Sequence, residues 1–313
     1  MSHILGIDIG GTTTVFGLID PNGKVHGKNK IPTQGSEPAE NLIQRIFYEV
    51  HAVLNHQPDI SLTGIGVGAP NGNHFTGFIQ DPPNINWGSV DFVSLMEGKF
   101  DVKVLLTNDA NAAALGEKSY GAAKSMDDFI MITLGTGLGS GMFSQGKLLY
   151  GHDGFAGELG HLSIDPNGRK CTCGQIGCLE AYVSAKGIKE TLKDLKTKYP
   201  DDEFLQSLVE NTLDGKQLDM AYDEGEKAVH EIYEFTGEKL GYGLAQTAGL
   251  FSPEAFIFYG GYSYAEERLF NPARKVMDEH LSPSQKGKIK LFRSKLSDGD
   301  AGILGAASLF SIK

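Results

Sequence analysis

The sequence predicts an α/β protein made of two similar halves. The pattern strand, Gly/Thr-rich turn, strand occurs at 4–20 and again at 128–143. In both halves, further buried strands alternate with stretches that have helical apolar spacing. The 313 residues, 40% of them hydrophobic, are enough for two domains with sizeable cores.

The first half is expected to contain four strands and two helices. Pro21-Asn22-Gly23 is a turn signal directly after the apolar stretch 15–20, which is typical of a hairpin. We expect strands at 4–9, 15–20, 64–70 and 102–107, and helices at 41–54 and from Ala110 to about Tyr120. The domain boundary should follow that second helix.

The second half repeats the strand, glycine turn and strand, and then becomes more helical. Short strands and loops alternate over 147–164, and 180–250 is mostly helical. A strand at 256–261 ends in a glycine pair, and a helix at 300–310 closes the chain.

Charge and composition exclude several classes of partner. The formal net charge of −11 argues against nucleic acid or an anionic membrane, because both require surplus Lys and Arg. No secretory signal and no apolar run of the ~20 residues that span a bilayer is visible. We therefore expect a cytoplasmic protein. If it binds an anion, we expect local groups such as backbone amides, helix N-termini and Mg²⁺ to hold it.

Two glycine-rich turns are candidate phosphate loops. Asp8-Ile9-Gly10-Gly11-Thr12-Thr13 combines glycines, which let backbone N–H groups approach a phosphate, with hydroxyl donors. Asp8 could hold Mg²⁺ through water. An ordinary glycine turn explains one such loop nearly as well, but the second loop, Gly135-Thr136-Gly137-Leu138-Gly139, favours phosphate.

Two other nucleotide motifs are excluded. The fingerprint G-x-G-x-x-G fails, because Ser140 lies three residues after Gly137 and Met142 three after Gly139. No Gly-Lys pair is followed by Ser or Thr, so the Walker sequence is missing as well.

Asn108 and Asp109 stand where an apolar strand gives way to a helix rich in small residues. One interpretation is a helix cap, because both residue types are favoured there. The other is a catalytic base at the carboxyl end of a strand, where open α/β sheets bind ligands.

All three cysteines fall within eight residues, in Cys171-Thr-Cys173-Gly-Gln-Ile-Gly-Cys178. An odd number of cysteines in a cytoplasmic protein argues against disulfides, and three thiolates with one imidazole make a closed zinc site. His161 is the favoured fourth ligand and His152 the alternative; a cluster without metal is the other interpretation. Such a zinc would be structural, because four protein ligands leave no open position.

The same zinc would fix two carboxylates. Glu158 precedes His161 by three residues, and Glu180 follows Cys178 by two. Rigid carboxylates suit a polyhydroxylated ligand, because they accept hydrogen bonds from hydroxyl groups strongly.

Several motifs together resemble the ROK (repressor, open reading frame, kinase) sugar kinases, and among them most closely the bacterial glucokinases. They occur in the family's order: DIGGTTT at 8–14, GVGAP at 66–70, NDANAAALGE at 108–117, TLGTGLGSG at 133–141 and GELGH…CTCGQIGCLE at 157–180. The histidine and cysteine segment is the most specific of them. YGG at 259–261 and the C-terminal helix extend the resemblance to nearly the full length.

The resemblance implies an actin-like, ribonuclease-H-like ATPase fold of two α/β domains around an interdomain cleft. A small domain would comprise 1–120 plus 300–313, and a larger one 121–299. The implied activity is phosphorylation of a hexose 6-hydroxyl by ATP and Mg²⁺. Glucose is the first choice among the hexose substrates, and a role in glycolysis is implied. A homodimer, or a tetramer, is also implied.

The resemblance also assigns roles to residues of this chain. Asp109 would be the general base. The sugar contacts would be Asn84, Asn108, Asp109, Glu158, His161 and Glu180. The ATP-binding residues would be Asp8, Gly10, Gly11, Thr12, Thr13, Gly135, Thr136, Gly137, Gly260 and Gly261. The zinc ligands would be His161, Cys171, Cys173 and Cys178.

One segment departs from the family pattern. The family's glucokinases commonly read APG where this chain reads Ala69-Pro70-Asn71-Gly72, and the loop 71–74 would border the sugar. Kinases for N-acetylglucosamine, N-acetylmannosamine or another hexose therefore stay open as alternatives. Trp87, near Asn84, is equally well explained by packing.

A sugar-sensing repressor of the same family is the alternative from another class. Such repressors carry a DNA-binding helix-turn-helix before the kinase-like part, whereas here the first glycine loop starts at Asp8. The acidic charge also disfavours DNA. A non-catalytic sugar-binding module would lack the base or a phosphate loop, and the sequence has both.

Overall fold

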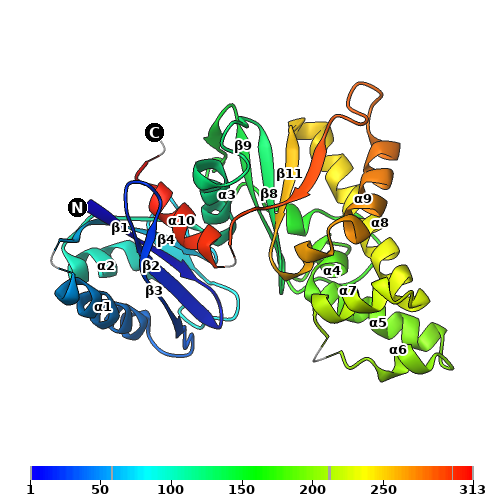
Figure 1. Cartoon of the computed structure of the whole chain (residues 1–313), viewed down its shortest axis with the longest axis horizontal. Coiled ribbons are helices and arrows are strands. Elements are labelled where there is room, and N and C mark those ends of the chain that lie inside the picture. Colours follow the sequence, from blue (N-terminus) through cyan, green and yellow to red (C-terminus); the bar gives the residue numbers. More distant parts are fainter. Residues whose placement is uncertain (1, 58, 211–212, 298, 312–313) are drawn as a thin grey trace. The chain divides into compact units, whose positions relative to one another are not determined.

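A computed structural model describes residues 2–57, 59–210, 213–297 and 299–311. The chain forms two compact units (Figure 1). The first contains Met1–Asp127, Gly141–Gly157 and Lys295–Lys313, and the second contains Asp128–Ser140 and Glu158–Ser294.

A five-stranded sheet in the order β3-β2-β1-β4-β7 organises the first unit. Its strands are β1 (Ser2–Ile9), β2 (Thr13–Ile19), β3 (Val25–Pro32), β4 (Ser61–Ala69) and β7 (Val104–Asn108). The expected hairpin is present, because β1 and β2 pair antiparallel, as do β2 and β3. Strands β1, β4 and β7 run parallel, so their carboxyl ends, with Asp8 and Asn108, share one edge of the sheet.

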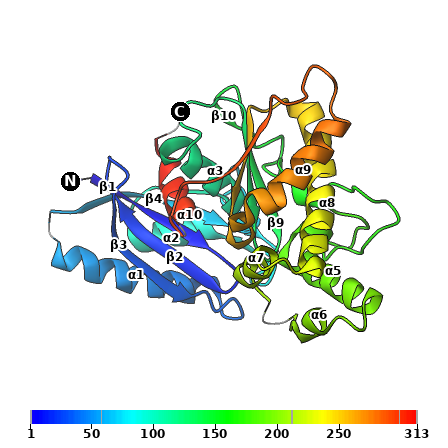
Figure 2. The same cartoon turned by 45° about the vertical axis from the view of Figure 1, so that its right-hand side comes forward.

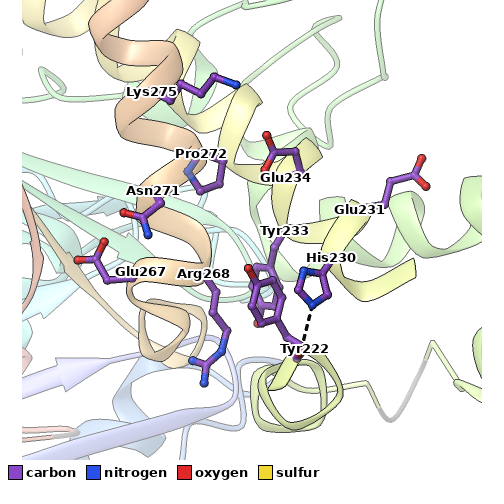
Figure 3. Close-up of a pocket in the computed structure, with 10 residues that line it drawn as sticks. All are labelled: Tyr222, His230, Glu231, Tyr233, Glu234, Glu267, Arg268, Asn271, Pro272 and Lys275. Atoms are coloured by element: carbon purple, nitrogen blue, oxygen red, sulfur yellow. Dashed lines mark hydrogen bonds between the residues drawn. The ribbon is translucent and has the colours of Figure 1, made fainter. Parts of the chain in front are cut away.

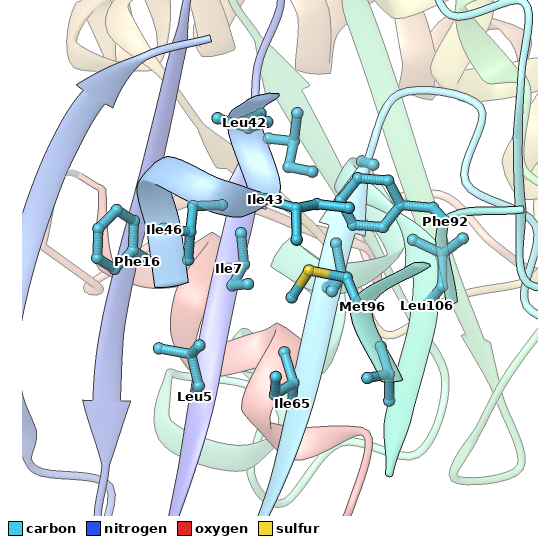
Figure 4. Close-up of a cluster of buried hydrophobic side chains, with 14 of the residues drawn as sticks. Leu5, Ile7, Phe16, Leu42, Ile43, Ile46, Ile65, Phe92, Met96 and Leu106 are labelled. Atoms are coloured by element: carbon cyan, nitrogen blue, oxygen red, sulfur yellow. The ribbon is translucent and has the colours of Figure 1, made fainter. Parts of the chain in front are cut away.

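Apolar side chains on one face of this sheet form the core with two helices. These are α1 (Ala39–His56) and α2 (Phe92–Phe100), and a short hairpin of β5 (Phe78–Gln80) and β6 (Ser89–Asp91) precedes α2. Figure 4 shows Leu5 and Ile7 of β1 pointing toward Ile46 of α1 and Met96 of α2. Because side chains of a strand alternate between faces, Gly6 lies on the opposite face.

Two helices pack on the opposite face, α3 (Asp109–Tyr120) and α10 (Asp300–Ser308). Alternate strand residues there are glycines. A Cβ at Gly6 would collide with the backbone carbonyl of Ile303, and one at Gly66 with that of Ala306. The missing side chains let the backbone of α10 lie directly on β1 and β4, so the last helix belongs to the first unit.

The second unit is built around the parallel strands β8 (Phe129–Leu134), β11 (Ala255–Tyr259) and β12 (Lys290–Arg293). Together with β9 (Leu138–Ser144) and β10 (Lys147–Leu148) they give the order β10-β9-β8-β11-β12. The helical elements of this unit are η1 (Leu159–His161), α4 (Glu180–Val183), α5 (Ala185–Lys198), α6 (Glu203–Ser207), α7 (Gly215–Asp223), α8 (Lys227–Phe251), η2 (Gly261–Ala265) and α9 (Glu267–His280). Figure 2 shows α8 and α9 side by side.

The division between the units differs from the expected ranges 1–120 plus 300–313 and 121–299. The segment 141–157 belongs to the first unit, so the boundary between the units falls within β9, after Ser140. A Cβ at Gly141 would lie 2.8 Å from the carbonyl oxygen of Ala110 and 2.6 Å from the Cβ of Ala114, so this part of β9 packs tightly on α3. Among the described residues, every helix is too short or too polar to traverse a bilayer.

Candidate functional site

The first glycine turn is closed by its own backbone and by Thr33. Gly10 N–H donates to the carbonyl of Thr13 at 3.0 Å. The Thr33 hydroxyl donates to the carbonyl of Gly10 at 2.6 Å and lies 2.9 Å from the Thr14 hydroxyl. Thr12 at the tip is exposed and therefore available to a ligand. No local sequence pattern pointed to Thr33, because its role depends on the pairing of β2 with β3.

Asp8 lies at the end of β1, on the same face as Gly6. A Cβ at Gly302 of α10 would lie 2.5 Å from its carboxylate, so the side chain rests against the helix backbone. Loss of hydration and, to a smaller extent, the nearby charge of Asp109 together raise the pKa of Asp8 to about 7. A carboxylate with so little hydration gains strongly from a cation, which suits the predicted Mg²⁺ site.

The structure confirms the helix cap at Asn108, and Asp109 stays a candidate for the catalytic base. Asn108 is the N-cap of α3, and its side chain accepts a hydrogen bond from Ala110 N–H at 2.9 Å. Asp109 is the first residue of the helix, and its Oδ1 accepts from the same N–H at 2.9 Å. Burial raises the pKa of Asp109, although the bond from Ala110 opposes the shift. A partly buried carboxylate with a raised pKa at the end of a strand is a candidate general base.

Asn84 lies beside the first glycine turn. A Cβ at Gly11 would be 3.2 Å from the Asn84 Cβ, and Asn84 itself has a left-handed φ of 64°. Trp87 has a packing role, since its indole N–H donates to the carbonyl of Glu37 at 2.8 Å and its ring stacks on Phe92.

In the second unit, the loop between β8 and β9 contains Gly135, Thr136 and Gly137. Gly135 N–H donates to the carbonyl of Gly137 at 3.0 Å, and Thr136 is exposed at the tip. Leu138 N–H donates to Oε2 of Glu180 at 2.9 Å. The structure thus brings a predicted sugar contact, Glu180, directly against a predicted phosphate loop.

The three cysteines and His161 form one group. Their ligand atoms all lie within 4.8 Å of one another. The Sγ atoms of Cys173 and Cys178 are 3.7 Å apart, and Cys171 Sγ is 3.9 Å from His161 Nδ1. Bonds of about 2.3 Å to a tetrahedral zinc imply sulfur separations of about 3.8 Å, so the spacing fits that ion. The histidine of this group is His161, not the alternative His152.

Three further predicted residues lie in the second unit, one beside this group and two at the end of strand β11. Glu158 Oε2 lies 3.9 Å from His161 Nε2, one helical turn away. Gly260 and Gly261 follow β11, and Gly260 has a φ of 98° and passes so close to the carbonyl of Leu134 that a Cβ would collide with it. Only glycine suits that conformation and space.

Arg169 anchors the hairpin that contains the cysteines, and the sequence did not single it out. Its guanidinium donates to the carbonyl of Gly187 at 2.9 Å and to Asp194 at 2.6 Å, and it lies over the rings of Tyr182 and Phe235. These partners come from α4, α5 and α8, so no local pattern could have revealed the role.

A cavity of ≈ 540 Å³ lies elsewhere in the second unit, between α8, α9 and the end of α7 (Figure 3). It contains none of the residues predicted for the site. His230 stacks on Tyr222 with ring centroids 3.7 Å apart, and Arg268 is bound by Asp223. Glu231 and Glu267 are likewise paired with residues outside the lining, Lys198 and Arg274, so the cavity offers no clear preference for a charged ligand.

Known proteins resemble this chain over nearly its whole length. A glucokinase of Thermotoga maritima is 36% identical over 98% of this chain and 96% of its own. A xylose repressor of Caldicellulosiruptor bescii is 30% identical over 99% of this chain and 78% of its own. The crystal structure of a ROK family glucokinase from Streptomyces griseus, in complex with glucose and AMPPNP, is 32% identical, covers 98% of both chains and has a TM-score of 0.82.

The structural similarity confirms the predicted fold class, a two-domain α/β fold of the actin-like, ribonuclease-H-like ATPase type. The family model of the ROK family matches residues 4–313. With that match and the full-length similarity to its members, the chain belongs to the ROK family.

Proposed function

We propose that this chain is an ATP-dependent hexose kinase that phosphorylates the 6-hydroxyl of glucose. The observation that carries the proposal is Asp109, a partly buried carboxylate with a raised pKa at the carboxyl end of β7. The glucokinases that resemble the chain over its full length, one of them solved with glucose and AMPPNP, support the same activity.

In the proposed reaction Asp109 accepts the proton of the sugar hydroxyl as its oxygen attacks. ATP with Mg²⁺ supplies the phosphoryl group, and Asp8 is proposed to bind the ion through water. Such transfers need little beyond positioning and charge neutralisation, so one base and well-placed donors are sufficient.

The remaining roles follow the family pattern. The proposed sugar contacts are Asn84, Asn108, Glu158, His161 and Glu180. The proposed nucleotide contacts are Gly10, Gly11, Thr12, Thr13, Gly135, Thr136, Gly137, Gly260 and Gly261. Exposed Thr12 and Thr136 at the two loop tips support these assignments.

We further propose that His161, Cys171, Cys173 and Cys178 bind a structural zinc ion. The donor set and its spacing support this metal. With four protein ligands the ion would stabilise the fold rather than take part in the transfer, and it would fix the hairpin that leads to Glu180.

The family also contains repressors, so kinase activity has to be distinguished from sugar sensing alone. A sensor needs the sugar pocket but no base. The carboxyl group of Asp109, whose pKa is raised by burial, and the two glycine loops suit phosphoryl transfer, whereas sugar sensing does not need them. The cytoplasmic location stays an expectation from the sequence and the homodimer one from the resemblance, and light scattering of the purified protein would test the latter.

The decisive experiment is an ADP-release assay over glucose, mannose, fructose, N-acetylglucosamine and N-acetylmannosamine, with Asp109→Ala as the inactive control. We expect the highest kcat/KM for glucose. A higher value for an N-acetylated sugar would redirect the proposal to the hexosamine kinases. Sugar binding without ADP release from any substrate would instead indicate a sensor.

A further inference from the structure

We propose that Glu180 is a positioning residue for the second glycine loop, in addition to its proposed contact with the sugar. The inference rests on the proposed nucleotide-binding role of that loop. Its starting point is the hydrogen bond from Leu138 N–H to Glu180 Oε2, 2.9 Å long, which joins residues 42 positions apart.

Two glycines make room for this contact. A Cβ at Gly137 would lie 2.5 Å from Glu180 Oε2, so the carboxylate rests directly on the loop backbone. A Cβ at Gly160 would collide with the carbonyl of Leu138, which brings the segment before the cysteines against the same residue. The loop is therefore supported by the carboxylate on one side and by the backbone near His161 on another.

The second oxygen of Glu180 is held from the hairpin side. Oε1 lies 3.4 Å from the Thr172 hydroxyl and 3.8 Å from Cys171 Sγ. A few residues later, Ala185 N–H donates to the carbonyl of Gly135 at 2.9 Å. The segment 180–185 thus holds the loop at both its first residue and Leu138.

A carboxylate beside a phosphate loop does not attract phosphate, because both are negative. Its benefit lies in fixing the backbone, so that the remaining N–H groups and the Thr136 hydroxyl point in one direction. A loop ordered before the ligand arrives loses less conformational entropy on binding, which raises affinity.

The test measures binding of AMPPNP with Mg²⁺ by calorimetry, in the absence of sugar. Glu180→Ala should weaken binding roughly tenfold, the effect of one charge-assisted hydrogen bond. Glu180→Asp withdraws the carboxylate by one methylene and should weaken binding similarly. Glu180→Gln keeps an acceptor oxygen at the same length and should stay within about threefold of wild type. A lost sugar contact cannot produce this pattern, because no sugar is present.

Glu190→Ala is the matched control, since Glu190 is exposed on α5 and bonded to Lys193. Its nucleotide affinity should equal that of wild type. Wild-type affinity in both Glu180→Ala and Glu180→Asp would overturn the inference, as would an equal loss in Glu180→Gln and Glu180→Asp. If Glu180→Ala does not fold, the Asp and Gln variants still decide. Wild-type protein that binds no nucleotide would overturn the proposed function itself.

Discussion

Asp8 at the end of β1 and Asp109 at the start of α3 lie close enough that the charge of Asp109 raises the pKa of Asp8. Two carboxylates near one another with little hydration are unfavourable for the folded chain alone. They are typical of a site that a cation completes, and a functional role would explain why the fold retains them.

This relationship predicts how stability depends on pH. The pKa of Asp8 is about 7 in the folded chain and about 4 in the unfolded chain, so the folded chain binds the proton more tightly. The free energy of unfolding should therefore fall as pH rises from about 4 to 7, by on the order of 2–4 kcal/mol from this group. Asp8→Asn has no carboxyl group at this position. Its free energy of unfolding relative to that of wild type should therefore rise between about pH 4 and pH 7.

Urea unfolding at pH 4.5 to 8, without Mg²⁺ or nucleotide, measures the difference between the two proteins. Apart from Asp109, which interacts with Asp8, the other titrating groups cancel in that difference because both proteins contain them. A difference that stays constant from pH 4.5 to 8 would contradict the prediction.

Asp109 should control the rate of the chemical step. Asp109→Ala should lower kcat by roughly 10²–10⁴ while the nucleotide Kd changes little, because a general base acts mainly in the transition state. In wild type, kcat/KM should fall toward acid pH as Asp109 becomes protonated, at a higher pH than for an ordinary aspartate, because burial raises its pKa.

Steady-state kinetics from pH 5 to 8 check both statements. Asp101→Asn is the control, because Asp101 is an exposed residue at the end of α2, and we expect it to keep wild-type kcat. An Asp109→Ala enzyme with unaltered kcat would remove this residue from the mechanism.

The sequence predicted the elements with clear periodicity and not those defined by tertiary contacts. Strand β1 and helix α3 follow from apolar spacing and capping residues. Strand β3, at the sheet edge, contains Lys28 and Lys30 and shows no apolar alternation. Helix α9 contains Pro272, which normally disfavours a helix, and here packs on Gly237 of α8.

The same distinction applies to the candidate site. Asp109 and the cysteines belong to local motifs, so the sequence identified them. The bond between Glu180 and Leu138 and the anchoring of Arg169 by Asp194 join residues that are 42 and 25 positions apart. Such contacts form only once the sheet and helices have assembled, and no local pattern in a single sequence predicts them.

The proposed zinc ion should be present in a fixed ratio to the chain and should stabilise the fold. Purified protein should contain one zinc per chain, and Cys173→Ser should lose it and lower Tm by about 5 °C or more, because metal binding adds to folding free energy. Elemental analysis and thermal melts measure both. His152→Ala is the control, since His152 is exposed and outside the ligand group, and it should retain the zinc. Protein free of zinc whose Tm does not respond to a chelator would contradict the assignment.

The contact between α10 and α3 should tolerate no added methyl group. A Cβ at Gly305 would collide with the carbonyl of Ala112 and lie 2.8 Å from Gly116 N, both backbone atoms that cannot move aside alone. Gly305→Ala should therefore destabilise the protein by about 1–3 kcal/mol, the usual effect of overpacking. Gly98 is the matched control: it lies in the exposed part of α2, and a Cβ there meets nothing within 4 Å.

Gly98→Ala should stabilise by about 0.5–1 kcal/mol, because alanine restricts the unfolded chain and favours the helix. Urea unfolding at one pH compares the two variants with wild type. The two changes in the free energy of unfolding should have opposite signs. A general sensitivity to Gly→Ala exchange would instead change the stability of both variants in the same direction. Equal stability of Gly305→Ala and wild type would mean that α10 can move away from α3 at no cost, and the close backbone packing inferred for this face of the sheet would be wrong.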